Sequence, residues 1–235
     1  MANILTFRYV ALLFLALGTS AVYAQETVMV TDKLPFGLAE RYHVLKANEK
    51  IKDGTYQAYL KKTAIASGMY RQGKKVGTWH FFDPAGKIVQ HYNYDRRKLI
   101  YEAAPDTAAY NIKYDFDKPN SPADTVTRAV KIGGIFYGLL PYVDKFKIDN
   151  NTMYSTQFYY GVMQLLVSPF GRLADCRLLV RSKRSNEVID TYVLDPELLT
   201  EEEKTFIPAT VNGHNVSTTI YIYCHLKNNF KISIY

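Results

Sequence analysis

Apolar and polar residues follow a regular order in the last third of the chain, between Tyr160 and Leu226. The run 162–167 is almost wholly apolar, which favours a strand in a sheet that is covered on one face. A turn signal follows at 168–171, where a proline fixes φ and a glycine is free to take positive φ. The next run places Cys176, Leu178 and Val180 on one face, so it predicts a second strand with one solvent-exposed side.

From Asp195 the pattern changes to that of a helix start. Asp195 is an N-cap residue, a proline takes the first helical position, and an acid follows near the positive end of the helix dipole. We expect this helix to run through Phe206 and to end before Pro208. A turn at Asn212-Gly213 then leads into a last strand, Val216 to Leu226, whose apolar side chains lie mostly at even positions. Because a helix joins the second strand to the third, the third is expected to lie beside the first.

This order of elements, with Phe206-Ile207-Pro208-Ala209 and Asn212-Gly213 at its hinge, resembles the C-terminal domain of TonB. The Gly133-Gly134 pair, followed by an apolar stretch to Val143, is similar to the start and first helix of the versions found in Bacteroidetes. The resemblance covers residues 131–235 and implies a three-stranded antiparallel sheet with packed helices. It also implies that an exposed strand edge accepts an extended peptide.

The segment 54–101 repeats itself with a period in the twenties, which is typical of stacked β-hairpins. Gly54-Thr55-Tyr56 is echoed by Gly77-Thr78-Trp79, and turn signals at Gln72-Gly73 and 84–86 mark hairpin tips. The stretch 68–87 resembles the bacterial variant of MORN repeats. That resemblance implies a single-layer antiparallel sheet over residues 25–102 that serves as a scaffold or binder. The fold class expected for the whole chain is therefore α+β and mostly β.

Composition supports this interpretation, since 20 Tyr and 12 Phe in 235 residues favour β-sheet with aromatic pairs across strands. Segment 1–24 reads as a cleaved signal peptide, with Arg8 as its only charge and Ala24 at the cleavage site. Its apolar core is short for a membrane span, so we expect an exported protein without a transmembrane anchor. The two resemblances imply that the compartment is the periplasm of a Gram-negative bacterium. Cleavage would lower the net charge from +7 to +6. Lys and Arg are scattered, so we expect no nucleic-acid partner.

The segment 103–130 holds three prolines and reads as a linker between the two domains, with 110–116 as a candidate capping strand on the repeat sheet. Cys176 and Cys224 would lie two strand spacings apart, roughly 10 Å, which exceeds the reach of a disulfide. Buried free thiols are therefore the preferred interpretation.

Candidate chemistry is sparse, and no nucleophile constellation appears. A four-residue turn at 83–86 would place His91 diagonally from His80 on one sheet face, but a metal site needs a third ligand. The acids 201–203 are expected to form a solvated helix face. Trp79, Phe81 and Tyr92 are either sheet core, which is preferred, or a ligand face. The sequence thus predicts no catalytic residue, no metal and no cofactor.

We therefore expect an exported, non-enzymatic protein-interaction module that captures an extended segment of an envelope or outer-membrane protein by strand addition. The predicted edge is 216–226. The partner-binding residues predicted on its solvent-exposed face are Thr219, Tyr221, Tyr223 and His225. The alternative is binding of envelope carbohydrate or anionic lipid by the aromatic and basic face of the repeat sheet.

Overall fold

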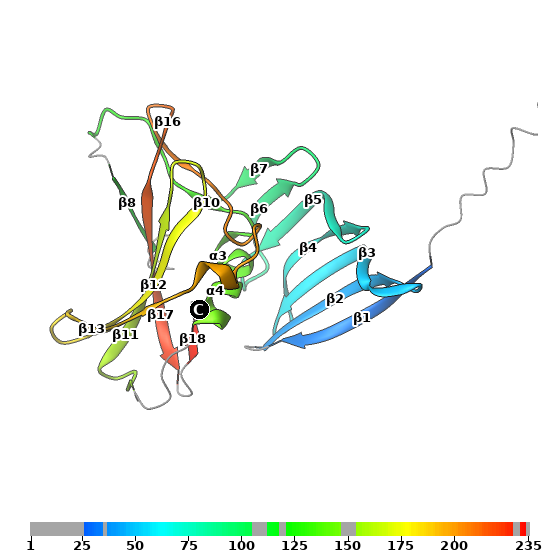
Figure 1. Cartoon of the computed structure of the whole chain (residues 1–235), viewed down its shortest axis with the longest axis horizontal. Helices are drawn as coiled ribbons and strands as arrows, with labels where there is room; N and C mark the ends of the chain where they lie inside the picture. Colours follow the sequence, from blue (N-terminus) through cyan, green and yellow to red (C-terminus); the bar gives the residue numbers. More distant parts are fainter. Residues whose placement is uncertain are drawn as a thin grey trace, which may run out of the picture.

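The computed structural model describes residues 26–34, 37–104, 112–117, 121–146, 154–227 and 231–233, with side chains up to residue 226. The predicted signal peptide lies outside them. The fold is mostly β, as predicted, and includes a large antiparallel sheet of seven strands. Two sheets dominate the molecule, and two short helices lie between them (Figure 1). Within the described residues, no helix combines the length and apolar character that a membrane span needs.

The first sheet is a simple antiparallel meander, in which each strand pairs with the next along the chain. Its strands are β1 (Thr27–Leu34), β2 (Leu38–Leu45), β3 (Asn48–Leu60), β4 (Thr63–Arg71), β5 (Lys74–Phe82), β6 (Ile88–Asn93) and β7 (Lys98–Glu102). The predicted hairpin tips are confirmed: Gln72 and Gly73 both take positive φ between β4 and β5, and Asp83 organises the turn before β6 through its carboxylate. One face is buried around Tyr56, Trp79 and Phe81.

The second sheet has six strands and is built around β11. Its strands are β11 (Tyr159–Val167), β12 (Leu173–Ser182), β13 (Val188–Val193), β17 (Thr218–Lys227), β8 (Ile112–Phe116) and β18 (Lys231–Ser233). β11 lies between β12 and β17, so the third predicted strand does lie beside the first. The predicted inward faces are correct, because Cys176, Leu178, Ile222 and Cys224 are all buried, and both thiols are free.

Short elements complete the fold. They are β9 (Val126–Thr127), β10 (Val130–Lys131), α3 (Gly134–Gly138), α4 (Leu140–Lys145), the 3-10 helix η2 (Pro196–Leu198), β14 (Phe206–Ile207), β15 (Ala209–Val211) and β16 (His214–Val216). The Asn212-Gly213 turn joins β15 to β16, as predicted. Leu139, Tyr142 and Val143 pack into the core of the second sheet, whereas Tyr137 and Leu140 pack against the first. The helical segment 134–145 therefore belongs to both cores.

The predicted helix from Asp195 to Phe206 is wrong beyond its first turn. Asp195 does cap it, accepting a hydrogen bond from the amide of Glu197 at 2.9 Å, but η2 ends at Leu198. Phe206 pairs instead with Lys131 as part of β14, so the chain must turn out of the helix before it. Residues 200–205 form local turns, in which the Glu203 carboxylate accepts the amide of Thr200 at 2.7 Å.

Candidate functional site

The four predicted partner-binding residues lie on the outward face of β17, as their odd positions imply. Thr219 and Tyr221 are half-buried, and Tyr223 and His225 are exposed. The Tyr223 ring stacks on Tyr160 of β11 with centroids 5.6 Å apart. The four residues share one face of the sheet, but β17 has a strand of the same sheet on each side.

The predicted strand edge at 216–226 is therefore wrong. β17 pairs with β11 on one side, and on the other with β8 over Thr218–Ile222 and with β18 over His225–Lys227. The covering strand β8 comes from the segment that the sequence assigns to a cap on the repeat sheet, and that assignment is wrong too. Ile112 is 6% exposed in the second core, so burial of its apolar side draws β8 to this sheet.

Within the described part of the chain, a free and regular edge lies instead at β1. Its eight residues pair with β2 without a bulge, from Thr27 opposite Leu45 to Leu34 opposite Leu38. The amide of Lys46 donates to the carbonyl of Glu26 at 2.9 Å, which fixes the alternation of the ladder. Backbone N–H and C=O groups of the odd residues of β1 consequently point away from β2. The outward-directed residues are Thr27, Met29, Thr31 and Lys33.

Within the described residues the second sheet ends at β13 on one side, and this edge is irregular. Its pairing with β12 shifts register between Val180 and Arg181. The Asp190 side chain accepts the amide of Thr191 at 2.8 Å, so one outward-directed donor is already satisfied. Among the described residues, β1 therefore offers the longer uninterrupted row of unpaired backbone groups. Met29 on it is 57% exposed, a large apolar side chain left in water.

The candidate ligand face made of Trp79, Phe81 and Tyr92 is core, which is the preferred sequence interpretation. Their exposed fractions are 0%, 0% and 7%. The helical segment covers part of this face, since the Tyr137 ring of α3 stacks on Phe81 with centroids 5.5 Å apart. This aromatic face is consequently closed to a large ligand.

His80 and His91 lie directly opposite each other on β5 and β6, not diagonally as predicted. The register differs by two residues from the predicted one: the bulge between Phe81 and Phe82 accounts for one, and the turn closed by the amide of Asp83 and the carbonyl of Lys87 accounts for the other. The two Nδ1 atoms are 3.1 Å apart, and burial together with the charge of His91 lowers the pKa of His80. The described part of the chain brings no group of three or more metal-binding side chains together.

The acids 201–203 lie in turns and not on a helix, but Glu201 and Glu202 are exposed to solvent as predicted. Each acid also pairs with a base from a distant segment of the chain. Glu201 binds Arg172 at 2.6 Å, Glu202 binds Lys75 at 2.6 Å, and Glu203 binds Lys145 at 3.0 Å. Lys75 belongs to the first sheet, so its pair with Glu202 joins the two sheet modules. The hydroxyl of Tyr94 also donates to Glu202 at 2.8 Å. These pairings connect segments far apart in sequence, so no local pattern predicts them.

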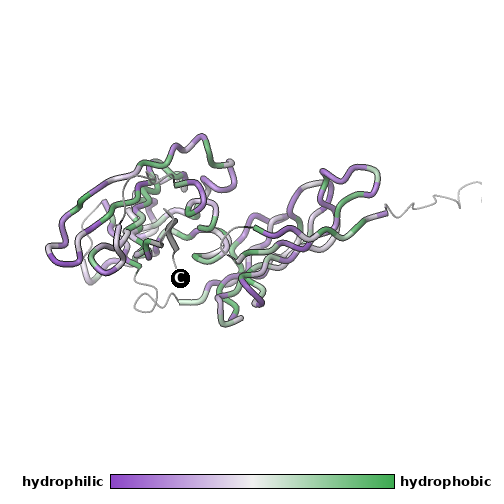
Figure 2. The backbone as a smooth tube through the Cα atoms, turned by 90° about the horizontal axis from the view of Figure 1, so that it is seen from below, coloured by the Kyte–Doolittle hydropathy of each residue, from purple (hydrophilic) through white to green (hydrophobic). Residues whose placement is uncertain are grey.

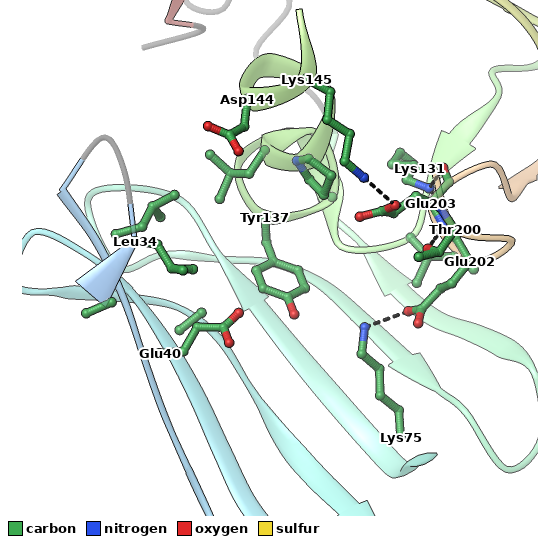
Figure 3. Close-up of a pocket in the computed structure, with 17 residues that line it drawn as sticks. Leu34, Glu40, Lys75, Lys131, Tyr137, Asp144, Lys145, Thr200, Glu202 and Glu203 are labelled. Atoms are coloured by element: carbon green, nitrogen blue, oxygen red, sulfur yellow. Dashed lines mark hydrogen bonds and ion pairs between the residues drawn. The ribbon is translucent and has the colours of Figure 1, made fainter. Parts of the chain in front are cut away.

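A cavity of about 370 Å³ opens beside these ion pairs, between the first sheet and α4 (Figure 3). Apolar side chains supply most of its wall, and carboxylates and amines lie around it. The residues that line it include Leu34, Leu38, Glu40, Ala58, Ile132, Tyr137, Leu140, Pro141, Asp144 and Glu202. Leu34, the last residue of β1, stands at one side, and Tyr137 projects into the middle of the view.

Lys131 lines this cavity and is 9% exposed. Its ammonium donates to the carbonyls of Glu202 at 3.1 Å and Thr205 at 2.9 Å, and also to that of Glu203. Described carboxylates form no direct ion pair with it. Burial therefore dominates and lowers the pKa of Lys131 to about 7, although the nearby charges of Glu202 and Glu203 act in the opposite direction.

This shift predicts a pH-dependent stability. Between about pH 7 and the ordinary lysine pKa, the unfolded chain binds more protons at Lys131 than the folded chain, so stability rises with pH. The cost of burying the ammonium is fully present below about pH 7. Relative to Lys131→Met, the wild type should gain about 2 kcal/mol between pH 7 and pH 9.

Urea unfolding of both proteins at pH 7, 8 and 9 measures this difference. Because burial also raises the pKa values of Cys176 and Cys224, the difference between the two proteins is the informative quantity, as the thiols are common to both. A difference that does not change with pH would contradict the expected titration of Lys131.

Comparison of this chain with protein-family models, with curated proteins and with solved structures finds no match in any of the three, so its function must be inferred from the geometry described above.

Proposed function

We propose that this protein is an exported, non-enzymatic binding protein of the bacterial periplasm that captures an extended segment of an envelope protein. The capture occurs by strand addition to β1, where the added segment pairs with the outward-directed backbone groups. The observation that carries the proposal is the regular free edge from Thr27 to Leu34. The backbone N–H and C=O groups of four of its residues point away from β2 and have no partner strand among the described residues.

Natural sheets usually protect such edges with short strands, prolines, bulges or inward charges. β1 has no proline and no bulge, and Lys33 is its only basic residue. Val28 and Met29 lie on opposite faces of the strand, and their exposed fractions are 42% and 57%. A captured segment would shield apolar side chains on both faces while its backbone completes the ladder, which favours an extended peptide over a helix or a flat surface.

The alternative, binding of envelope glycan or anionic lipid by the aromatic face, has less support. Trp79, Phe81 and Tyr92, the rings expected to contact such a ligand, are buried in the first core, and Tyr137 of α3 covers Phe81. β1 instead offers backbone groups, which recognise another backbone irrespective of its side chains.

Thr31→Pro tests this proposal, because proline removes an outward-directed N–H but leaves the pairing of β1 with β2 intact. Linear peptides selected from a displayed random library on the wild-type chain should bind Thr31→Pro about tenfold more weakly. Thr31→Val, which keeps the N–H, should bind them normally. Hydrogen exchange should show that the peptides protect the amides of Met29, Thr31 and Lys33.

Two results would count against capture at β1. One is a set of peptides that bind Thr31→Pro as tightly as the wild type or protect Thr191 and Val193 of β13. The other is a library that yields no binder. Thermal unfolding of Thr31→Pro, expected within a few degrees of the wild type, shows that a loss of binding is not a loss of folding.

A further inference from the structure

The cavity beside β1 has an apolar wall contributed by both modules. Leu34, Leu38 and Ala58 come from the first sheet, and Ile132 and Leu140 come from the helical side. A cavity of about 370 Å³ is near the lower end of the range that holds small ligands. It suits one or two side chains better than a large cofactor.

The charged groups around the cavity are paired with one exception. Glu40 accepts hydrogen bonds from Lys52 at 3.1 Å and from Tyr56 at 2.6 Å. Glu202 and Glu203 have their lysine partners, and the Lys131 ammonium is occupied by three backbone carbonyls. Asp144 is exposed and forms neither an ion pair nor a hydrogen bond with the described part of the chain.

Asp144 lies on the same side of Tyr137 as Leu34, away from both dashed ion pairs (Figure 3). The open part of the cavity is therefore bounded by apolar side chains, by the paired carboxylate of Glu40 and by the unpaired carboxylate of Asp144. A complementary group has an apolar stem and a single positive charge at its end. The lysine side chain has this chemistry, since its four methylenes pack on apolar surface while its ammonium reaches a charge.

We infer that this cavity receives a lysine side chain of the segment captured at β1. This inference rests on the proposed strand addition, because Leu34 ends β1 and also lines the cavity, so a residue paired near Leu34 reaches the opening. The stem packs against Leu34 and Leu140, and the ammonium pairs with Asp144. The cavity thus adds side-chain specificity to a backbone interaction that has little of its own.

The test uses n-butylammonium, which reproduces the lysine side chain, together with butanol and butyrate, which have the same apolar chain length. Ligand-observed NMR on the full chain should show butylammonium binding about fivefold or more tightly than butyrate. Asp144→Asn should remove this preference without weakening the binding of butanol. Asp117→Asn is the matched control, because Asp117 is exposed next to the second sheet and does not line the cavity.

Equal binding of butylammonium and butyrate, a preference that survives in Asp144→Asn, or no binding of either probe would overturn the lysine pocket. The Thr31→Pro variant separates this failure from failure of strand addition, because it should leave butylammonium binding unchanged. Selected peptides provide the second measurement. Replacing a peptide lysine by norleucine should weaken binding to the wild type about fivefold, and should have little effect on binding to Asp144→Asn.

Discussion

Gly68→Ala should destabilise the protein by at least about 3 kcal/mol, with a fall in melting temperature of about 10 °C. A Cβ atom at residue 68 would lie 2.2 Å from Cδ2 of Trp79, which is far inside van der Waals contact. Trp79 is 0% exposed, and its indole N–H donates to the carbonyl of Met69 at 3.2 Å. The indole therefore lies against the glycine, and its hydrogen bond to the next residue of the same strand holds it there.

The indole cannot move aside, because other rings surround it. Its centroid is 5.1 Å from that of Tyr56, 5.3 Å from that of Tyr70 and 5.6 Å from that of Tyr94. A shift of Trp79 would displace these rings and the ion pair of Lys75, whose ammonium lies 4.8 Å from the indole centroid. Close packing thus makes the added methyl costly.

Gly77→Ala is the control for Gly68→Ala. Gly77 takes a φ of +66°, but no atom lies within 4 Å of an added Cβ, so only backbone strain of about 1 kcal/mol is expected. Urea unfolding followed by Trp79 fluorescence measures both variants. Similar small losses for the two would contradict a steric role for Gly68. In a Trp79→Leu background, which lacks the only tryptophan and is therefore followed by circular dichroism, the cost of Gly68→Ala should shrink, which identifies the indole as the obstacle.

Local sequence patterns predicted the elements that bury one face. The strands β11, β12 and β17 each alternate or cluster apolar residues toward one core, and the turns at 168–171 and Asn212-Gly213 carry residues suited to their backbone. The first sheet was predictable for the same reason, since Gly and aromatic residues recur in phase with its hairpins. In these segments the local pattern and the tertiary packing require the same structure.

The predictions failed where contacts with distant parts of the chain determine the local structure. No local pattern marks β1 as a strand or as a free edge, because both of its faces are largely exposed and its burial shows no period of two. The helix after Asp195 was predicted too long because its cap is real, yet Glu202 and Phe206 are held by Lys75 and Lys131, which lie more than 70 residues earlier in the chain. β8 was assigned to the wrong sheet, and that error made β17 look like an edge. The candidate site could not be predicted, since its edge has no pattern and its cavity forms between two modules.

The second large effect is expected for Tyr137→Ala, which should cost about 3 kcal/mol and separate the unfolding of the two modules. Tyr137 projects from α3 onto the aromatic face of the first sheet, where its ring stacks on Phe81 and its hydroxyl lies 3.1 Å from that of Tyr56. Burial raises the pKa of Tyr137 well above its usual value, as expected for a phenol held away from water. The Lys75 ammonium lies 5.5 Å from its ring centroid.

Tyr137→Phe is the matched control. It keeps the ring and removes only the hydroxyl, and Tyr56 keeps its hydrogen bond to Glu40 at 2.6 Å, so we expect a loss of about 1 kcal/mol or less. The single tryptophan of the chain, Trp79, lies in the first sheet, so its fluorescence reports that module alone, whereas circular dichroism reports both.

In the wild type, and in Tyr137→Phe, the fluorescence and dichroism transitions in urea should coincide, because the helical segment is part of both cores. In Tyr137→Ala the fluorescence transition should occur at lower urea, since the first sheet loses the ring that covers its aromatic face. Coincident transitions in Tyr137→Ala would show that the ion pair of Lys75 with Glu202 and the remaining helix contacts suffice to couple the modules. The cavity between them would then be held by charge pairing more than by the aromatic ring at its centre.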